Sequence, residues 1–155
     1  MNTPSKPAQQ ETQTLAGVRL QRHADYQRAY AASRKRQSAS MSWFLAPQPS
    51  AASGGGTRVA HRLPTGPRIG LTVGKVLGKA HERNRIKRRM REVLRRHLEL
   101  FPRRSDLILH PRRVVLSMEF TKLEAELVRI LTQAKADEAR RTAQPGLRTA
   151  AVPPA

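Results

Sequence analysis

The chain has 155 residues, with 30 Lys and Arg against 11 Asp and Glu, which gives a net charge of +19. It contains no cysteine, which excludes disulfides and thiolate zinc sites. The sequence has no signal-peptide pattern, and no apolar run approaches the roughly 20 residues of a membrane span. This composition favours a soluble cytoplasmic protein that binds a polyanion, either nucleic acid or an anionic membrane.

The front of the chain combines a polar tail with a short helix. Residues 1–16 are rich in Pro, Gln and Thr, and they predict a disordered N-terminal tail. A helix is predicted from Ala24 to Ser33, because Tyr26 and Tyr30 are four residues apart and share one helical face. From this spacing alone the two tyrosines are interpreted as core residues.

Three strands are predicted next, over residues 36–40, 41–46 and 68–74. In the second strand the side chains alternate between two faces, with Met41, Trp43 and Leu45 on one and Ser42, Phe44 and Ala46 on the other. Residues 47–67 are rich in Pro, Gly and Ser. They predict a flexible loop between strands that is longer than the usual connection of about 4–6 residues.

The second half of the chain predicts a helix from Ala80 to His97, a strand over 106–110 and a helix over 118–135. A disordered tail is expected over 136–155, which leaves one folded domain over 17–135. The order α-βββ-α-β-α predicts an α+β fold, a two-layer α-β sandwich with a four-stranded sheet and three helices.

The predicted helix 80–97 has an apolar stripe and a cationic face. The stripe contains Ile86, Met90, Val93, Leu94 and His97, and the opposite row contains Asn84, Arg88, Arg91 and Arg95. Nine Lys and Arg but two acids lie between Lys79 and His97, so most of these cations have no partner within the helix. A solvated charged face is one interpretation, and contact with nucleic acid is the favoured one. A membrane-surface helix is disfavoured, because the sheet needs the apolar stripe.

The segment LGKAHERNRIKRRMR, from Leu77 to Arg91, is similar to the signature of the bacterial ribonuclease P protein component. Its centre is the Arg-Asn-Arg stretch at 83–85. The preceding segment PRIGLTVGK and the earlier element DYQRAY match the family in the same order. The resemblance extends from about Arg19 to Lys135.

This resemblance implies a fold with a left-handed strand-helix-strand crossover, an exception to the usual hand. It implies an endoribonuclease that works as a ribonucleoprotein. The RNA subunit would be the catalyst and would hold most of the Mg²⁺, removing the 5′ leader of precursor tRNA. The partners implied are the catalytic RNA and that leader. We expect no catalytic residue and no metal site in the protein, no membrane and no obligate protein partner.

Residue roles follow from matching positions. The RNA contacts implied by the signature and the cationic row are Lys75, Arg83, Asn84, Arg85, Lys87, Arg88, Arg91 and Arg95. Tyr26 and Tyr30 match aromatic residues that contact the leader, and Phe44 is the substitute contact from the strand. Two positions depart from the family pattern. Val76 replaces a common second lysine, and Ala46 stands where other members can have an aromatic residue.

Two other functions stay open from the residues alone. One is an RNA-binding protein of the ribosomal type without a catalytic partner. The other is an autonomous nuclease, which needs several convergent carboxylates around two metal ions. The acids here are scattered and the five histidines lack metal-ligand spacing, so the sequence does not favour catalysis by the protein.

Overall fold

A computed structural model describes residues 15–49 and 66–143. Its helices are α1 (His23–Ala31), α2 (Ala80–Arg96) and α3 (Phe120–Ala143), and its strands are β1 (Arg36–Gln37), β2 (Met41–Pro47), β3 (Arg68–Leu71) and β4 (Ser105–Pro111). Within these two ranges, no helix has both the length and the apolar composition to cross a bilayer. Most of the predicted 47–67 loop and much of both predicted tails lie outside the described residues.

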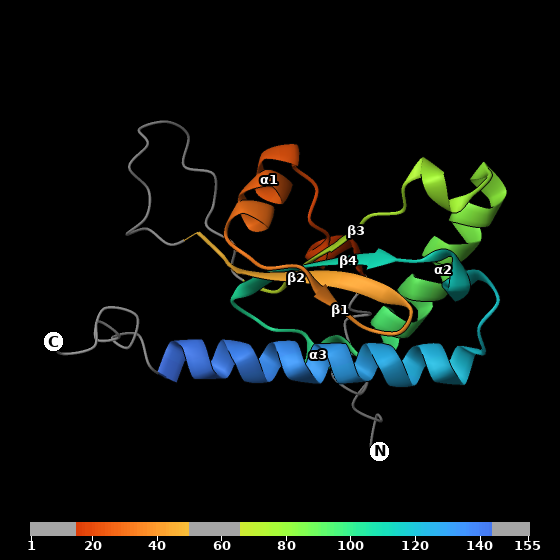
Figure 1. Ribbon diagram of the computed structural model, residues 1–155. Helices are drawn as coiled ribbons and strands as arrows, with labels where there is room; N and C mark the ends of the chain where they lie inside the picture. Colours follow the sequence, from red (N-terminus) through yellow and green to blue (C-terminus); the bar gives the residue numbers. More distant parts are fainter. Residues whose placement is uncertain (1–14, 50–65, 144–155) are drawn as a thin grey trace, which may run out of the picture.

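The strands form one mixed sheet in the order β1-β2-β4-β3. β2 pairs antiparallel with β1 and β4, whereas β3 and β4 are parallel and therefore need a crossover, which contains α2. Figure 1 shows α1 on one face of the sheet and α3 along the opposite face. The predicted α+β class and element order are confirmed, and the left hand of the crossover stays a prediction.

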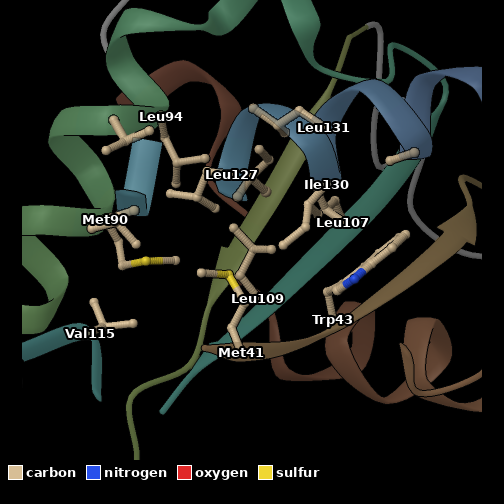
Figure 2. Close-up of a cluster of buried hydrophobic side chains, with 14 of the residues drawn as sticks. Met41, Trp43, Met90, Leu94, Leu107, Leu109, Val115, Leu127, Ile130 and Leu131 are labelled. Atoms are coloured by element: carbon tan, nitrogen blue, oxygen red, sulfur yellow. The ribbon is translucent and has the colours of Figure 1, made fainter. Parts of the chain in front are cut away.

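The alternation of side chains along β2 and β4 divides the core into two parts. Met41 and Trp43 of β2 and Leu107 and Leu109 of β4 face the core beneath α2 and α3 (Figure 2). All four residues predicted for the stripe of α2 before its C-terminus are buried there: Ile86, Met90, Val93 and Leu94. The opposite face is smaller, and α1 packs there on Ala46 and Ile108.

The C-terminal helix differs from the predicted range. It begins at Phe120 and continues to Ala143, so the residues after 135 that were expected to be disordered are helical up to that point. Glu138 explains the extension, because its buried carboxylate accepts hydrogen bonds from the backbone N–H groups of Arg103 and Arg104, at 3.0 and 2.9 Å. A search for an apolar stripe does not detect this polar anchor.

Three further boundaries also differ from the prediction. Residues 15–18, two of them placed in the predicted tail, form a short 3-10 helix, and the chain then pairs with β3 through a bridge between Arg19 and Ile69. Leu15 packs against the main core, which holds this segment in place. β1 is shorter than predicted, and β3 ends at Leu71 because a 3-10 turn at 75–77 begins the approach to α2.

Glu126 of α3 anchors the turn between β1 and β2. Its buried carboxylate accepts hydrogen bonds from the backbone N–H of Ser40, at 2.9 Å, and from the hydroxyls of Ser38 and Ser40. Burial alone would raise the pKa of Glu126, but these hydrogen bonds lower it below 4.5. Its contribution to stability is therefore complete above the ordinary glutamate pKa and is lost as the pH falls through the lowered value.

We expect Glu126→Gln to reduce the free energy of unfolding at pH 7 by about 1–3 kcal/mol, because buried donors lose acceptors. The difference from wild type should shrink as the pH falls through the lowered pKa of Glu126. Urea unfolding at several pH values from neutral into the acid range measures both effects. Glu119→Gln, at an exposed position just before the same helix, is the control and should change stability by less than about 0.5 kcal/mol. Equal stability of Glu126→Gln and wild type at pH 7 would contradict the assignment.

Candidate nucleic-acid interface

Local contacts fix the start and the orientation of α2, so that its cationic face points away from the sheet. Gly78 has φ 135°, a conformation that favours glycine, and it turns the chain into the helix. The carboxylate of Glu82 accepts a hydrogen bond from the backbone N–H of Lys79 at 3.1 Å, which lowers its pKa. Arg113 donates to the same carboxylate at 2.7 Å and to the carbonyl of Leu77 at 2.8 Å. These contacts join the first turn of α2 to the segment that follows β4.

The outer face of α2 carries several cations without a partner among the described residues. Arg85, Lys87, Arg88 and Arg91 form no hydrogen bond or ion pair with any residue in the described ranges, and the same holds for Lys75 in the preceding turn. Asn84, Arg85, Arg88 and Arg91 are exposed. Arg95 is also exposed but pairs with Glu92 at 2.8 Å. The predicted row is therefore present, and most of its charge is available to an external anion.

Two arginines of α2 behave differently from this row. Arg89 donates to the carbonyl oxygens of Val115, at 2.7 Å, Leu116, at 3.0 Å, and Met118, so it holds α2 against the turn before α3. Helical spacing places it beside the cationic row and gives no sign of this structural role. Arg83 is half-buried, and its Nε is enclosed without a hydrogen-bond partner among the described residues. RNA contact by Arg83 stays a prediction.

The segment before α1 joins the cationic face to the aromatic one. A hollow beside α2 is lined by Leu15, Arg88, Arg91, Glu92 and Arg95. A second hollow, of about 50 Å³, lies where the segment meets β3 and is lined by Leu15, Arg91, Tyr26 and neighbouring apolar residues. Leu15 and Arg91 border both hollows. A ligand on the outer face of α2 is thus adjacent to the side of α1 that carries Tyr26.

Tyr26 packs α1 against the sheet. Its hydroxyl donates to the carbonyl of Leu20 at 3.2 Å, and burial raises its pKa. The ring lies against Gly70, where an added Cβ would come within 2.7 Å of it, so a larger residue at this position would displace the ring. This packing agrees with the core interpretation from helical spacing. Leader contact by Tyr26 stays a prediction.

Tyr30 and Phe44 lie together, and the structure adds a third ring that the sequence reading missed. Their ring centroids are 4.9 Å apart, and the ring of His110 lies 5.7 Å from Tyr30 and 5.4 Å from Phe44. His110 belongs to β4, where its alternation with Ile108 could have placed it on the α1 face. Ala46 is buried in this face and Val76 is 94% exposed, so neither departure from the family pattern disturbs the packing.

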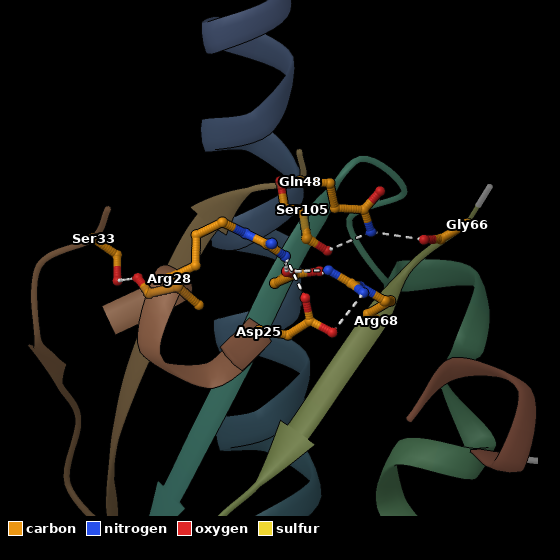
Figure 3. Close-up of polar contacts among 9 residues, drawn as sticks. Asp25, Arg28, Ser33, Gln48, Gly66, Arg68 and Ser105 are labelled. Atoms are coloured by element: carbon orange, nitrogen blue, oxygen red, sulfur yellow. Dashed lines mark hydrogen bonds and ion pairs between the residues drawn. The ribbon is translucent and has the colours of Figure 1, made fainter. Parts of the chain in front are cut away.

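A buried ion-pair network fixes the other end of α1 (Figure 3). The side chain of Asp106 is 1% exposed, and Arg68 binds its two oxygens at 2.8 and 2.7 Å. Arg68 also contacts Asp25 of α1 at 3.3 Å, and Arg28 lies 3.9 Å from Asp106. Burial opposes the charge of Arg68, but the contacts with Asp106 raise its pKa overall. The network joins α1, β3 and β4.

The described residues offer no evident metal site. No three His, Asp or Glu side chains in residues 15–49 and 66–143 are gathered closely enough to hold a metal ion. The expectation that the protein itself holds no metal ion stays a prediction, and no chemical step is assigned to a metal on the protein.

The fold and this surface define a small, strongly basic α-β protein with a cationic helix face on one side and clustered rings on the other. The chain belongs to the ribonuclease P protein family, whose model, described as "Ribonuclease P", matches residues 16–135.

Individual relatives agree with this assignment. A ribonuclease P protein component from Thermobifida fusca is 29% identical over 129 residues, which is 80% of this chain and 82% of that protein. The component from Finegoldia magna is 34% identical over 76 residues, or 49% of this chain and 67% of that protein. The component from Maridesulfovibrio salexigens is 43% identical over 63 residues, or 41% of this chain and 51% of that protein.

Solved structures show the same fold. The RNase P protein from Thermotoga maritima superposes with a TM-score of 0.59 at 21% identity, covering 74% of this chain and 96% of that one. The RNase P protein from Staphylococcus aureus gives 0.58 at 24% identity, with 76% and 95% covered.

Proposed function

We propose that this chain binds the catalytic RNA of ribonuclease P and the 5′ leader of precursor tRNA, and that it assists the removal of the leader. The observation that carries this proposal is the set of α2 cations with no partner in residues 15–49 and 66–143, which lies in the segment that resembles the family signature. Each phosphate that such a cation neutralises releases a counterion, so RNA binding stabilises this otherwise self-repelling face.

The leader is assigned to the opposite side of the sheet. An unpaired strand presents base faces, and stacking on aromatic rings stabilises binding by about 1–3 kcal/mol per base. Tyr30 and Phe44 are half-buried and close together, so part of each ring remains accessible, which supports them as the leader contacts. Arg91 lies near Tyr26 around the hollow at the edge of β3, so RNA on α2 and a strand along α1 can be neighbours.

The chemistry is assigned to the RNA subunit. There Mg²⁺ would activate water and stabilise the leaving oxygen, giving a tRNA with a 5′ phosphate. The protein contributes by positioning precursor tRNA on the catalytic RNA and by neutralising phosphates near the cleavage site. We place this assembly in the cytoplasm, with the RNA subunit and the leader as the partners.

Reconstitution tests the proposal. The purified protein, its cognate RNA subunit and precursor tRNA are combined at low magnesium, and leader removal is followed on a gel. We expect cleavage only when protein and RNA subunit are both present. Binding without any gain in cleavage would favour a ribosomal-type RNA-binding protein. Cleavage by the protein alone would favour an autonomous nuclease.

A further inference from the structure

His110 is the third member of the ring cluster, and the family resemblance assigned no role to it. Tyr30 of α1, Phe44 of β2 and His110 of β4 are all half-buried and come from three elements. The Tyr30 hydroxyl lies 2.8 Å from Nε2 of His110, which fixes the orientation of the imidazole ring.

The second ring nitrogen of His110 is available. Nδ1 forms no hydrogen bond with a residue in the described ranges, and it is not among their enclosed polar atoms that lack a partner. Burial lowers the pKa of His110, and the charge of Lys35 lowers it further, so the imidazole is neutral at neutral pH. A neutral imidazole carries one proton. If Tyr30 donates to Nε2, then Nδ1 is a donor, and if Tyr30 accepts, then Nδ1 is an acceptor.

We propose that His110 is a base-contact residue of the leader site, where Nδ1 hydrogen-bonds the edge of an unpaired base lying against Tyr30 and Phe44. The inference rests on the proposed function and deepens it. Rings alone would hold any base by its face. A hydrogen-bonding group beside the rings can distinguish bases by the groups on their edges. Its two tautomers allow His110 to hydrogen-bond either a donor or an acceptor on the base edge.

A purely structural role is the competing explanation, because the contact between Tyr30 and His110 also joins α1 to β4. The α1 helix has other anchors, however. Ala29 is buried against the sheet, Tyr26 packs on Gly70, and Asp25 binds Arg68. The ring cluster is therefore not the only anchor of the helix, and its half-buried rings keep some surface that a ligand can contact.

The test compares affinities for precursor tRNA with a short leader and for mature tRNA, using the holoenzyme reconstituted from the full chain and its RNA subunit. We expect His110→Ala to lower the ratio of the two affinities about tenfold. Tyr30→Phe keeps the ring but removes the hydroxyl that orients His110, and should lower the ratio about threefold. Affinity for the RNA subunit should not change in either variant.

His23→Ala is the matched control, because His23 is exposed at the start of the same helix. Its ratio should equal that of wild type. A wild-type ratio of one would overturn the proposed function itself. A different result would overturn only the role of His110. In that case wild type binds precursor tRNA more tightly than mature tRNA, and His110→Ala and Tyr30→Phe both keep the wild-type ratio. Thermal unfolding checks each variant, and if His110→Ala does not fold, Tyr30→Phe decides the outcome.

Discussion

Arg88→Ala combined with Arg91→Ala is expected to weaken binding of the RNA subunit roughly 10- to 100-fold at moderate salt, because each arginine loses a charge-assisted contact with phosphate. Both side chains are exposed and have no partner among the described residues. The free energy of unfolding should therefore change by less than about 0.5 kcal/mol. The plot of log affinity against log salt should become shallower by about two, one for each lost contact. Fluorescence anisotropy with labelled RNA at several salt concentrations measures both effects.

Lys122→Ala combined with Arg129→Ala is the matched control for this double variant. It removes the same two charges from exposed positions of α3, on a different helix from the proposed RNA face. We expect it to lower affinity by no more than about twofold, through the general attraction of a basic protein for RNA. If both double variants lose affinity equally, net charge alone explains the binding and α2 is not the interface. Unchanged affinity for both would exclude the electrostatic account.

Asp106→Ala should have the largest effect on stability, a loss of about 3–5 kcal/mol, because removing one partner of a buried ion pair leaves the other without compensation. Asp106 is almost fully buried, and its two oxygens are both bound by Arg68. Urea unfolding measures the loss. Arg28→Ala is the control, because that arginine lies 3.9 Å from the same carboxylate and pairs instead with Asp25 at 2.6 Å, so its loss leaves the contacts between Arg68 and Asp106 in place.

A second variant separates the pair from the packing. Asp106→Leu combined with Arg68→Met removes both charges and should recover much of the stability that either single change loses. A double variant whose loss equals the sum of the single losses would show that the two residues act independently.

The network also bears on leader binding, because it holds the end of α1 that precedes the ring cluster. In variants that lose only one partner of the ion pair, the ratio of affinities for precursor tRNA and mature tRNA should therefore also fall.

The helical parts of the site follow directly from the sequence. The spacing of Ile86, Met90, Val93 and Leu94 determines which face of α2 is buried, and the cations on the opposite side are then exposed by geometry. Arg89 has a role that helical spacing does not predict. It is 26 residues from Val115, and only the folded chain brings that carbonyl into reach.

The sheet face and the chain ends depend more on such distant contacts. His110 is adjacent to Tyr30 because the registers of β2 and β4 place Ser42 opposite His110, and a single sequence does not specify strand register across 68 residues. Glu138 extends α3 through hydrogen bonds to a turn 34 residues earlier in the chain. The segment at 15–18 lies on the core because Leu15 and Val18 pack there. Two apolar residues next to a polar tail are too few to give a recognisable pattern in the sequence.

The bridge between Arg19 and Ile69 also bears on the behaviour of the chain before it meets RNA. Leu20 donates its backbone N–H to Ile69 at 2.8 Å, so the outer edge of β3 is partly covered. The other edge strand, β1, has two residues. Long open strand edges recruit further strands and lead to aggregation. With one edge partly covered and the other short, the described sheet leaves little open strand edge on which another strand could pair.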